Sequence, residues 1–196
     1  MASQPPSGEN SASETPAGDW ADAILDYWLK ELGSEGWWEK SAATDATITR
    51  RFGALWEEKQ ADAPASFLGR ADTALAAILL FDQFPRNMFR NDAKAFSTDA
   101  LAREIARGAI ARGYDVQTGG PVRAFFYIPF MHSEDLADQE HCLSLIDQPG
   151  LEENLAFARK HHAVVERFGR FPHRNAVLGR ENRPGEEDAI AEGAGW

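Results

Sequence analysis

Apolar side chains along most of the chain recur every three or four residues, which is the spacing of one face of an α-helix. A first stretch begins at Asp19, a residue suited to an N-cap, and stops at Gly33; its apolar positions are Ile24, Leu25, Trp28 and Leu32. A second stretch follows Asp45 and ends near Pro64, with apolar positions at Ile48, Phe52, Leu55 and Trp56. The pattern therefore predicts two amphipathic helices at the start of the folded region.

A third predicted helix is apolar on nearly every side, which is typical of a helix at the centre of a packed domain. Its apolar residues are Leu75, Ile78, Leu79, Leu80 and Phe81. We expect this helix to end at Phe84, because Pro85 disfavours helical geometry in the residue before it.

The second half of the chain continues the helical pattern. One helix follows the start signal at Ser97 to Asp99 and runs to Gly113; the others cover Phe125 to Phe130, Ser133 to Ile146, Leu151 to Phe168 and Glu186 to Glu192. The Phe125 to Phe130 run is too short for periodicity to separate strand from helix. We interpret it as helical, because the rest of the chain offers no strand to pair with it.

With the short Glu186 to Glu192 segment left open as a helix, these elements add up to about seven helices with short connections and no alternating strand pattern. The expected fold is all-α, an array of antiparallel helix hairpins in a single domain over residues 19–192. Residues 1–18 are rich in Ser, Pro and Gly, lack Lys and Arg, and are predicted to form a disordered tail. Residues 193–196 are predicted to be a short C-terminal tail.

Composition narrows the classes of partner. The hydrophobic fraction of 43%, with 12 Phe and 6 Trp, is too large for a disordered chain. A formal net charge of −11 disfavours charge-driven binding to nucleic acid or to anionic membranes. The lone Cys142 rules out an internal disulfide, and no apolar run approaches the 20 or so residues of a membrane span. We therefore expect a cytoplasmic protein.

Asp82 is the most informative polar position of the third helix. It extends the apolar stripe of Leu75 and Ile78, so its carboxylate is expected to be buried. A buried carboxylate near a helix C-terminus needs a cationic or hydrogen-bonding partner, and Arg86, Arg90 and Arg123 are the candidates. The prediction leaves two interpretations open, a structural ion pair or an acid that faces a ligand.

Two corners of the chain share a short motif. Phe84, Pro85, Arg86 and Asn87 follow the third helix, and Phe171, Pro172, His173, Arg174 and Asn175 follow the long late helix. A structural interpretation explains the proline as a helix end, the phenylalanine as an anchor and the asparagine as a cap. It does not explain the arginines. Two arginines from similar corners are able to converge on a carboxylate or a phosphate.

Two histidines are candidates for a functional role. His161 falls on the apolar face of the long late helix, where a buried histidine with one hydrogen bond is the more common outcome. His132 precedes Ser133 and Glu134, which suit an N-cap and a helix first turn. His132 becomes a candidate acid or base if it faces the same cavity as Asp82.

Several common chemistries are excluded by their missing motifs. The chain has no GxxxxGK[ST], GxGxxG or GxSxG segment, and therefore no familiar phosphate loop or nucleophile elbow. It has no HExxH, and the single Cys142 cannot complete a zinc deaminase site. We assign no metal-ligating residues and name no cofactor.

Four segments resemble a known family. They are ALAAILLFDQFPRNMFR, AFSTDALARE, FFYIPFMHSEDLADQ and FGRFPHRNAVLGR, beginning at Ala74, Ala95, Phe125 and Phe168. In this order they are similar to bacterial domain-of-unknown-function family 924 over about Ile24 to Glu187. The resemblance implies an all-α fold similar to tetratricopeptide-repeat proteins. It lends no reaction and no catalytic residue.

The leading hypothesis is a pocket between helices that binds a small polar or anionic molecule. The proposed proton-transfer residues are Asp82, His132 and His161, and the proposed ligand-binding residues are Arg86, Asn87, Glu134, Arg174 and Asn175. The alternative is a tetratricopeptide-like scaffold that binds a peptide or partner protein on its concave face, with exposed aromatics such as Trp37 and Trp38. The sequence alone does not establish whether the protein is an enzyme.

Overall fold

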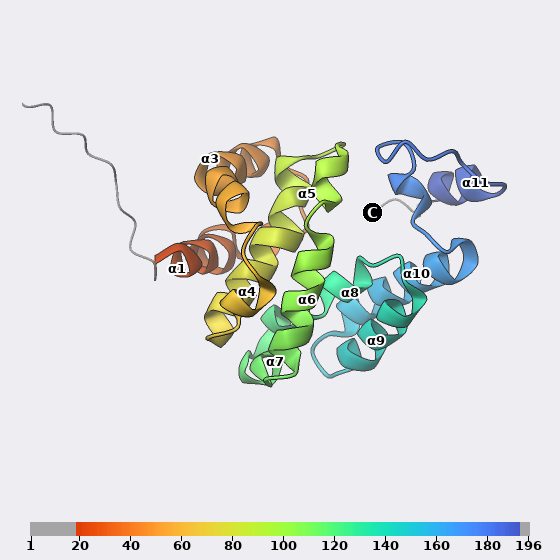
Figure 1. Cartoon of the computed structure of the whole chain (residues 1–196). Helices are drawn as coiled ribbons and strands as arrows, with labels where there is room; N and C mark the ends of the chain where they lie inside the picture. Colours follow the sequence, from red (N-terminus) through yellow and green to blue (C-terminus); the bar gives the residue numbers. More distant parts are fainter. Residues whose placement is uncertain (1–18, 193–196) are drawn as a thin grey trace, which may run out of the picture.

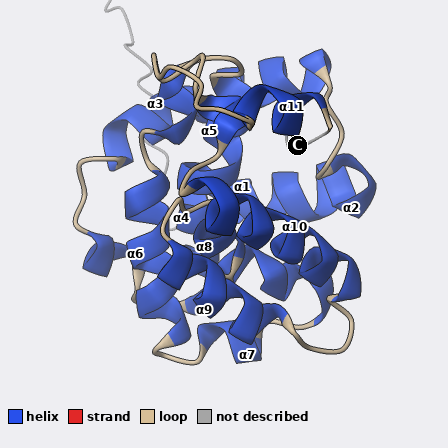
Figure 2. Cartoon of the chain, turned by 90° about the vertical axis from the view of Figure 1, so that its right-hand side faces the viewer, coloured by secondary structure: helices blue, strands red, loops and turns tan. Residues whose placement is uncertain are grey.

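A computed structural model describes residues 19–192, and the tails expected at 1–18 and 193–196 lie outside these residues. Within this range the ordered elements are helices and turns, with no strand, which confirms the all-α class (Figure 2). Among the described residues, no helix is at once long enough and apolar enough to cross a bilayer.

The first half of the described chain contains long helices broken by tighter or wider turns. The α-helices are α1 (Asp19–Leu25), α2 (Gly33–Gly36), α3 (Ala42–Lys59), α4 (Ala71–Ile78), α5 (Phe84–Met88) and α6 (Asp99–Ile110). Between them lie the π-helical segments η1 (Asp26–Leu32) and η3 (Leu79–Gln83), and the 3-10 segments η2 (Pro64–Phe67) and η4 (Ala93–Phe96).

The second half is built in the same way. Its α-helices are α7 (Tyr114–Gln117), α8 (Ile128–Met131), α9 (Leu136–Ile146), α10 (Glu152–Phe168) and α11 (Glu186–Ala191). The 3-10 segments are η5 (Gly120–Phe126) and η6 (Pro172–Arg174), so the aromatic run at Phe125 to Phe130 is helical as expected. Gly169 ends α10 with a φ of 67°, a conformation that glycine adopts without steric cost.

The helices surround a central column. Figure 1 shows α4, α5 and α6 in the middle of the molecule, with α1 and α3 on one side and α8, α9 and α10 on the other. The main packed pairs are α1 with α4, α4 with α6, α3 with α5, and α9 with α10. From Ala74 to its end at Ile78 the α4 helix is buried on every side, as its sequence predicts.

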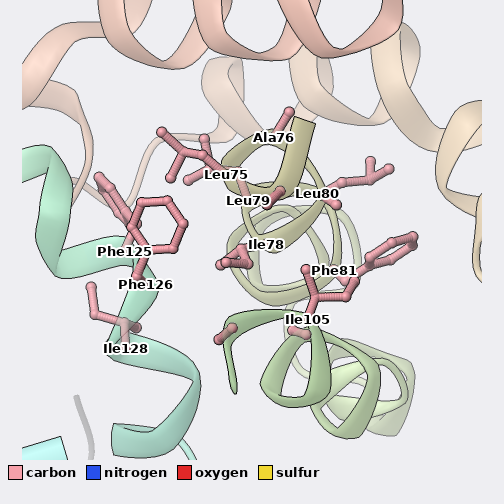
Figure 3. Packing of buried hydrophobic residues seen from close by; sticks show 14 of the residues in the cluster. Leu75, Ala76, Ile78, Leu79, Leu80, Phe81, Ile105, Phe125, Phe126 and Ile128 are labelled. Carbon is pink, nitrogen blue, oxygen red and sulfur yellow. The ribbon is translucent and has the colours of Figure 1, made fainter. Parts of the chain in front are cut away.

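The core gathers around α4 and η3. Figure 3 shows Leu79, Leu80 and Phe81 on this column, with Phe125 and Phe126 facing it from η5. All five side chains are buried. The polar Asp82 and Gln83, also buried, follow directly in the same turn, so the fold carries a carboxylate into the middle of its apolar core.

The expectation that Pro85 ends the third helix is wrong. The helix widens into the π turn η3 and continues as α5, with Pro85 in the first turn of α5. A proline is tolerated there because its missing N–H would have no partner in an ordinary first turn. The wide turn therefore lets one helical column pass through a proline that would break a regular α-helix.

The Thr98 hydroxyl takes the place of the backbone N–H donor that Pro85 lacks. The Phe81 carbonyl lies four residues before Pro85, and the Thr98 hydroxyl donates to it at 2.7 Å. Trp56 Nε1 donates to the same hydroxyl oxygen at 3.2 Å. Because Thr98 immediately precedes α6, this contact also fixes the start of α6 against the π turn that carries Asp82.

The helix count differs from the expected value of about seven, because single predicted helices divide at these irregular turns. The stretch from Asp19 contains α1, η1 and α2, and the third helix contains α4, η3 and α5. The expected N-cap at Ser133 is also wrong, since Asp135 accepts from the Ala137 amide and caps α9. A tetratricopeptide-like arrangement of the hairpins is not confirmed.

Candidate functional site

An open pocket of about 880 Å³ lies between the start of α6 and the end of α10. The loop between α8 and α9 forms its third wall, and the segment after α10 closes the far side. Its polar lining side chains are Asp99, Arg103, His132, Ser133, Glu134, Asp135, Glu166 and Arg174. Three of the sequence-predicted site residues, His132, Glu134 and Arg174, line this pocket.

Asp82 and His132 form a hydrogen-bonded pair behind this pocket. His132 Nδ1 lies 2.8 Å from Asp82 Oδ1, and Gln83 Nε2 donates to Asp82 Oδ2 at 2.6 Å. Asp82 is fully buried, whereas the His132 side chain keeps 19% of its surface exposed. The sequence predicts Arg86, Arg90 or Arg123 as the partner of Asp82. In the structure its hydrogen bonds are instead with His132 and Gln83.

The environment keeps Asp82 ionised. Burial raises the pKa of this carboxyl, but His132 and the Arg86 guanidinium favour the charged form more strongly, and the net shift of the pKa is downward. An ionised Asp82 accepts a hydrogen bond from His132 Nδ1–H, and when the ring is neutral this bond fixes the tautomer. The other ring nitrogen, Nε2, then carries a lone pair.

Arg86 and Arg174 converge on one carboxylate. Arg86 Nη2 donates to Asp99 Oδ2 at 2.9 Å, and Arg174 Nη1 lies 3.6 Å from the same oxygen. Arg86 also donates to the Ala95 carbonyl. Burial and the nearby Asp82 raise the pKa of Asp99, while the guanidinium of Arg86 opposes that shift. The two arginines of the repeated Phe-Pro corners thus meet at the N-terminus of α6.

Arg174 is a buried cation with few polar contacts. Its side chain is 8% exposed, and its guanidinium lies between the rings of Phe96 and Phe171, 4.5 and 4.6 Å from their centroids. It donates no hydrogen bond to any residue that the structure describes, and its Nε is buried without a partner among them. Burial and the neighbouring Arg86 lower the pKa of Arg174 to about 10, so the group remains charged at neutral pH.

The N-terminus of α6 lies at the same pocket, which Asp99 and Ala100 line. No described side chain caps this helix, because the Thr98 hydroxyl donates to the Phe81 carbonyl instead. Free backbone amides at a helix start attract negative charge. A buried guanidinium and an uncapped helix start therefore face one space, and both favour an anion.

His161 lies behind the pocket rather than in its lining. Its ring centroid is 6.3 Å from that of His132 and 5.5 Å from that of Phe171, and its Nδ1 bonds the Phe157 carbonyl at 2.9 Å. Burial and the neighbouring His132 lower the pKa of His161 to about 3. The ring is therefore neutral at physiological pH and supports His132 by packing.

Glu134 lines the pocket but is already paired. Arg180 Nη1 and Nη2 donate to its two carboxylate oxygens at 2.7 and 2.9 Å, and the Phe171 amide donates at 2.7 Å. Burial raises the pKa of Glu134, but the hydrogen bonds from Arg180 and the Phe171 amide lower it by more, so the net shift is downward. Glu134 fastens the segment after α10 to the loop before α9.

The two asparagines of the repeated corners lie away from the pocket. Asn87 Nδ2 donates to Asp45 Oδ1 on α3 at 2.8 Å, and neither residue lines the pocket. Asn175 Nδ2 donates to Glu186 Oε2 at 2.9 Å, beside the bidentate pair that Glu186 forms with Arg170. Neither asparagine caps the following turn, and the structure does not bring them to the other candidate residues. Arg86 also does not line the pocket; it lies behind Asp99.

Sequence reasoning missed Asp99, Arg180 and Phe96. Asp99 was interpreted only as a helix start signal, and nothing local shows that two distant arginines reach it. Arg180 lies in a loop six residues after Arg174, where no periodicity predicts its direction. Residues 19–192 contain no group of three or more His, Cys, Asp or Glu side chains that could hold a metal ion.

Comparison with known proteins assigns relatives but no reaction. A family model described as "Bacterial protein of unknown function (DUF924)" matches residues 24–194. A solved structure of a protein of unknown function from Agrobacterium tumefaciens is 42% identical and aligns with a TM-score of 0.85 over 91% of this chain and 100% of that chain. No curated protein matches the chain.

Proposed function

The chain belongs to the DUF924 family of bacterial proteins of unknown function, and we propose that it binds a small anionic molecule in the pocket between α6 and α10. The observation that carries this proposal is Arg174, a charged guanidinium that is nine-tenths buried and donates no hydrogen bond to the described residues. A buried charge without hydrogen bonds is costly to the fold. A bound carboxylate or phosphate would supply the missing acceptors.

The neighbouring groups support an anion over a neutral ligand. Asp99 is the nearest acid to Arg174, but its oxygen at 3.6 Å is too distant for a good hydrogen bond and already accepts from Arg86. Arg103, which also lines the pocket, is paired with Asp138 at 3.0 Å. Arg174 and the α6 amides are thus the groups with donors to spare.

Thermal unfolding in the presence of small anions tests the proposal. The panel contains acetate, succinate, inorganic phosphate and sulfate at matched ionic strength, because a ligand at 100 times its dissociation constant adds about 2.7 kcal/mol to the stability of the folded state. We expect at least one anion to raise the midpoint of the wild type and to have no such effect on Arg174→Ala. Equal responses of both proteins to every anion would refute the proposal.

The alternative, a tetratricopeptide-like scaffold for a peptide or partner protein, is favoured by one surface feature. Trp38 is 59% exposed and stacks on Phe125 at a centroid distance of 5.9 Å. Trp37, beside it, is instead held inward by a hydrogen bond from its Nε1 to the Trp28 carbonyl at 2.8 Å. Trp38→Ala should abolish binding of a peptide partner while leaving the response to anions intact.

A further inference from the structure

We propose that the pocket is an active site that hydrolyses small carboxylic esters bearing a second, ionised carboxylate. His132 acts as the general base that activates water, and Asp82 is a positioning residue. This inference rests on the proposed anion binding at Arg174, which would hold the carboxylate of the substrate.

The geometry of His132 is that of a prepared base. Asp82 Oδ1 accepts from Nδ1, and Gln83 holds the second carboxylate oxygen, so the acid cannot rotate away from the ring. His132 lines the pocket, and within residues 19–192 its ring forms a hydrogen bond through Nδ1 alone. Nε2 is therefore available to take a proton from a molecule in the pocket, in the manner of an Asp-supported histidine.

The nucleophile assigned to this site is water. Ser133, next to the base, donates a hydrogen bond to Asp138 Oδ2 at 2.7 Å and accepts one from the Asp135 amide, so its proton and one of its lone pairs are engaged. Cys142 is fully buried, and desolvation raises the pKa of its thiol to about 12. Neither side chain is placed to form a covalent intermediate with help from His132.

Charge balance favours a carboxylate over a phosphate as the anchoring group. The two guanidinium groups of Arg86 and Arg174 already face the carboxylates of Asp82 and Asp99. A monoanion adds one negative charge to this balanced cluster, whereas a phosphate dianion adds two. A carboxylate also matches the fork of donors on a single guanidinium.

The proposed reaction balances as a simple hydrolysis. A water molecule gives one proton to His132 Nε2 while its oxygen forms a bond to the ester carbonyl carbon. The free amides at the start of α6 are donors for the negative charge that develops on the carbonyl oxygen. The bond from that carbon to the alkoxy oxygen then breaks, and His132 returns its proton to the leaving oxygen, which gives an acid and an alcohol.

The test compares two 4-nitrophenyl esters, the hydrogen succinate with a free carboxylate and the neutral propionate. We expect the succinate ester to be hydrolysed with the higher kcat/KM. His132→Gln should lower kcat by about 10²–10⁴-fold, the usual contribution of a general base. The matched control His162→Gln, on the same helix as His161 but outside the pocket lining, should leave kcat unchanged.

Two further variants separate anchoring from positioning. Arg174→Ala should raise KM for the succinate ester and leave the neutral ester unaffected. Asp82→Asn should lower kcat but not raise KM, because an amide in this place favours the tautomer with the proton on Nε2. Thermal unfolding and succinate binding of Asp82→Asn show that the loss of kcat does not come from a loss of folded protein.

These experiments distinguish a failure of the hydrolysis inference from a failure of the anion-binding proposal. If wild type cleaves the succinate ester no faster than His132→Gln, the hydrolysis inference is overturned. If succinate still binds in an Arg174-dependent manner, the binding proposal survives that result. If succinate and the other anions do not bind at all, both fall together.

Discussion

His132 Nδ1 lies 2.8 Å from Asp82 Oδ1, although 50 residues separate the two along the chain. The contact joins the π turn at the centre of the core to the loop that leads into α9. It also connects a fully buried carboxylate to a ring that faces the pocket. The chemistry proposed for the pocket therefore depends on how the π turn is held in place.

Thr98→Val should destabilise the fold by about 1–3 kcal/mol, the cost of leaving a buried polar group without its partner. Thr98 is buried, and its hydroxyl serves the Phe81 carbonyl that Pro85 cannot serve. The measurement is the free energy of unfolding in urea. The control Thr118→Val removes a half-buried hydroxyl that bonds the Tyr114 carbonyl within its own turn, and should cost about 0.5 kcal/mol or less. Equal costs for the two variants would contradict this role of Thr98.

Acid sensitivity of the fold should depend on His161. Burial lowers the pKa of this ring to about 3 in the folded protein, whereas an unfolded histidine has a pKa of about 6.5. Between these values the unfolded chain binds the additional proton. The contribution of His161 to stability is therefore complete above about pH 6.5 and is lost as the pH falls toward 3, by at most about 1.4 kcal/mol per unit.

Urea unfolding of His161→Gln at a series of pH values checks this dependence. The variant keeps a side chain able to donate to the Phe157 carbonyl but removes the titrating ring. Its stability should fall less steeply than that of the wild type between pH 6.5 and 4. Parallel curves would show that His161 is not the neutral, desolvated group described above.

Two glycine substitutions should change stability in opposite directions. Gly169→Ala places a side chain at φ 67° and should destabilise the protein by about 1–2 kcal/mol, although nothing lies within 4 Å of the added methyl group. Gly53→Ala lies within α3, where the nearest atom is Met88 Sδ at 4.0 Å, and should stabilise by about 0.5–1 kcal/mol. Urea titration of both variants checks the pair; a stabilising Gly169→Ala would contradict the conformation at the end of α10.

Asn87→Ala and Asn175→Ala should leave anion binding unchanged, because Asn87 contacts Asp45 and Asn175 contacts Glu186 rather than the pocket. The measurement is the succinate concentration that gives half of the maximal thermal shift. The shift should persist with the same midpoint concentration in both variants, even where the starting stability is lower. A loss of binding in Asn87→Ala would place the ligand beside Asp45 of α3 instead of in the pocket.

Much of the fold was predictable from periodicity, because each amphipathic helix has a local signal. The long helices α3, α6 and α10 lie where the apolar pattern predicts them. The π turn at Leu79–Gln83 was not predictable in this way. Thr98, 17 residues after Phe81, donates its hydroxyl to the carbonyl that Pro85 leaves without a partner. An argument that considers only the local effect of Pro85 therefore ends the helix too early.

The candidate site was predictable in its residue types but not in its pairings. The burial of Asp82 followed from its place on an apolar stripe, and its need for a partner followed from physical chemistry. The partner itself is fixed by the packing of α8 and α9 against α10 and α6, which no local pattern encodes. For the same reason Arg86 and Arg174 were expected to converge on an anion, yet Asp99 could not be named as the residue they share.

The central claim is that the Arg174 guanidinium binds an anion. The NMR signal of the Arg174 Nε–H group tests this binding most directly. In a protein labelled with 15N-arginine, the Nε–H cross-peak of Arg174 is assigned by its absence from Arg174→Lys. We predict that titration with succinate moves this cross-peak to a saturating limit, while the Nε–H cross-peak of Arg170, held by Glu186 at 2.8 Å, stays in place. An Arg174 cross-peak that does not move with succinate, acetate or phosphate would contradict the account.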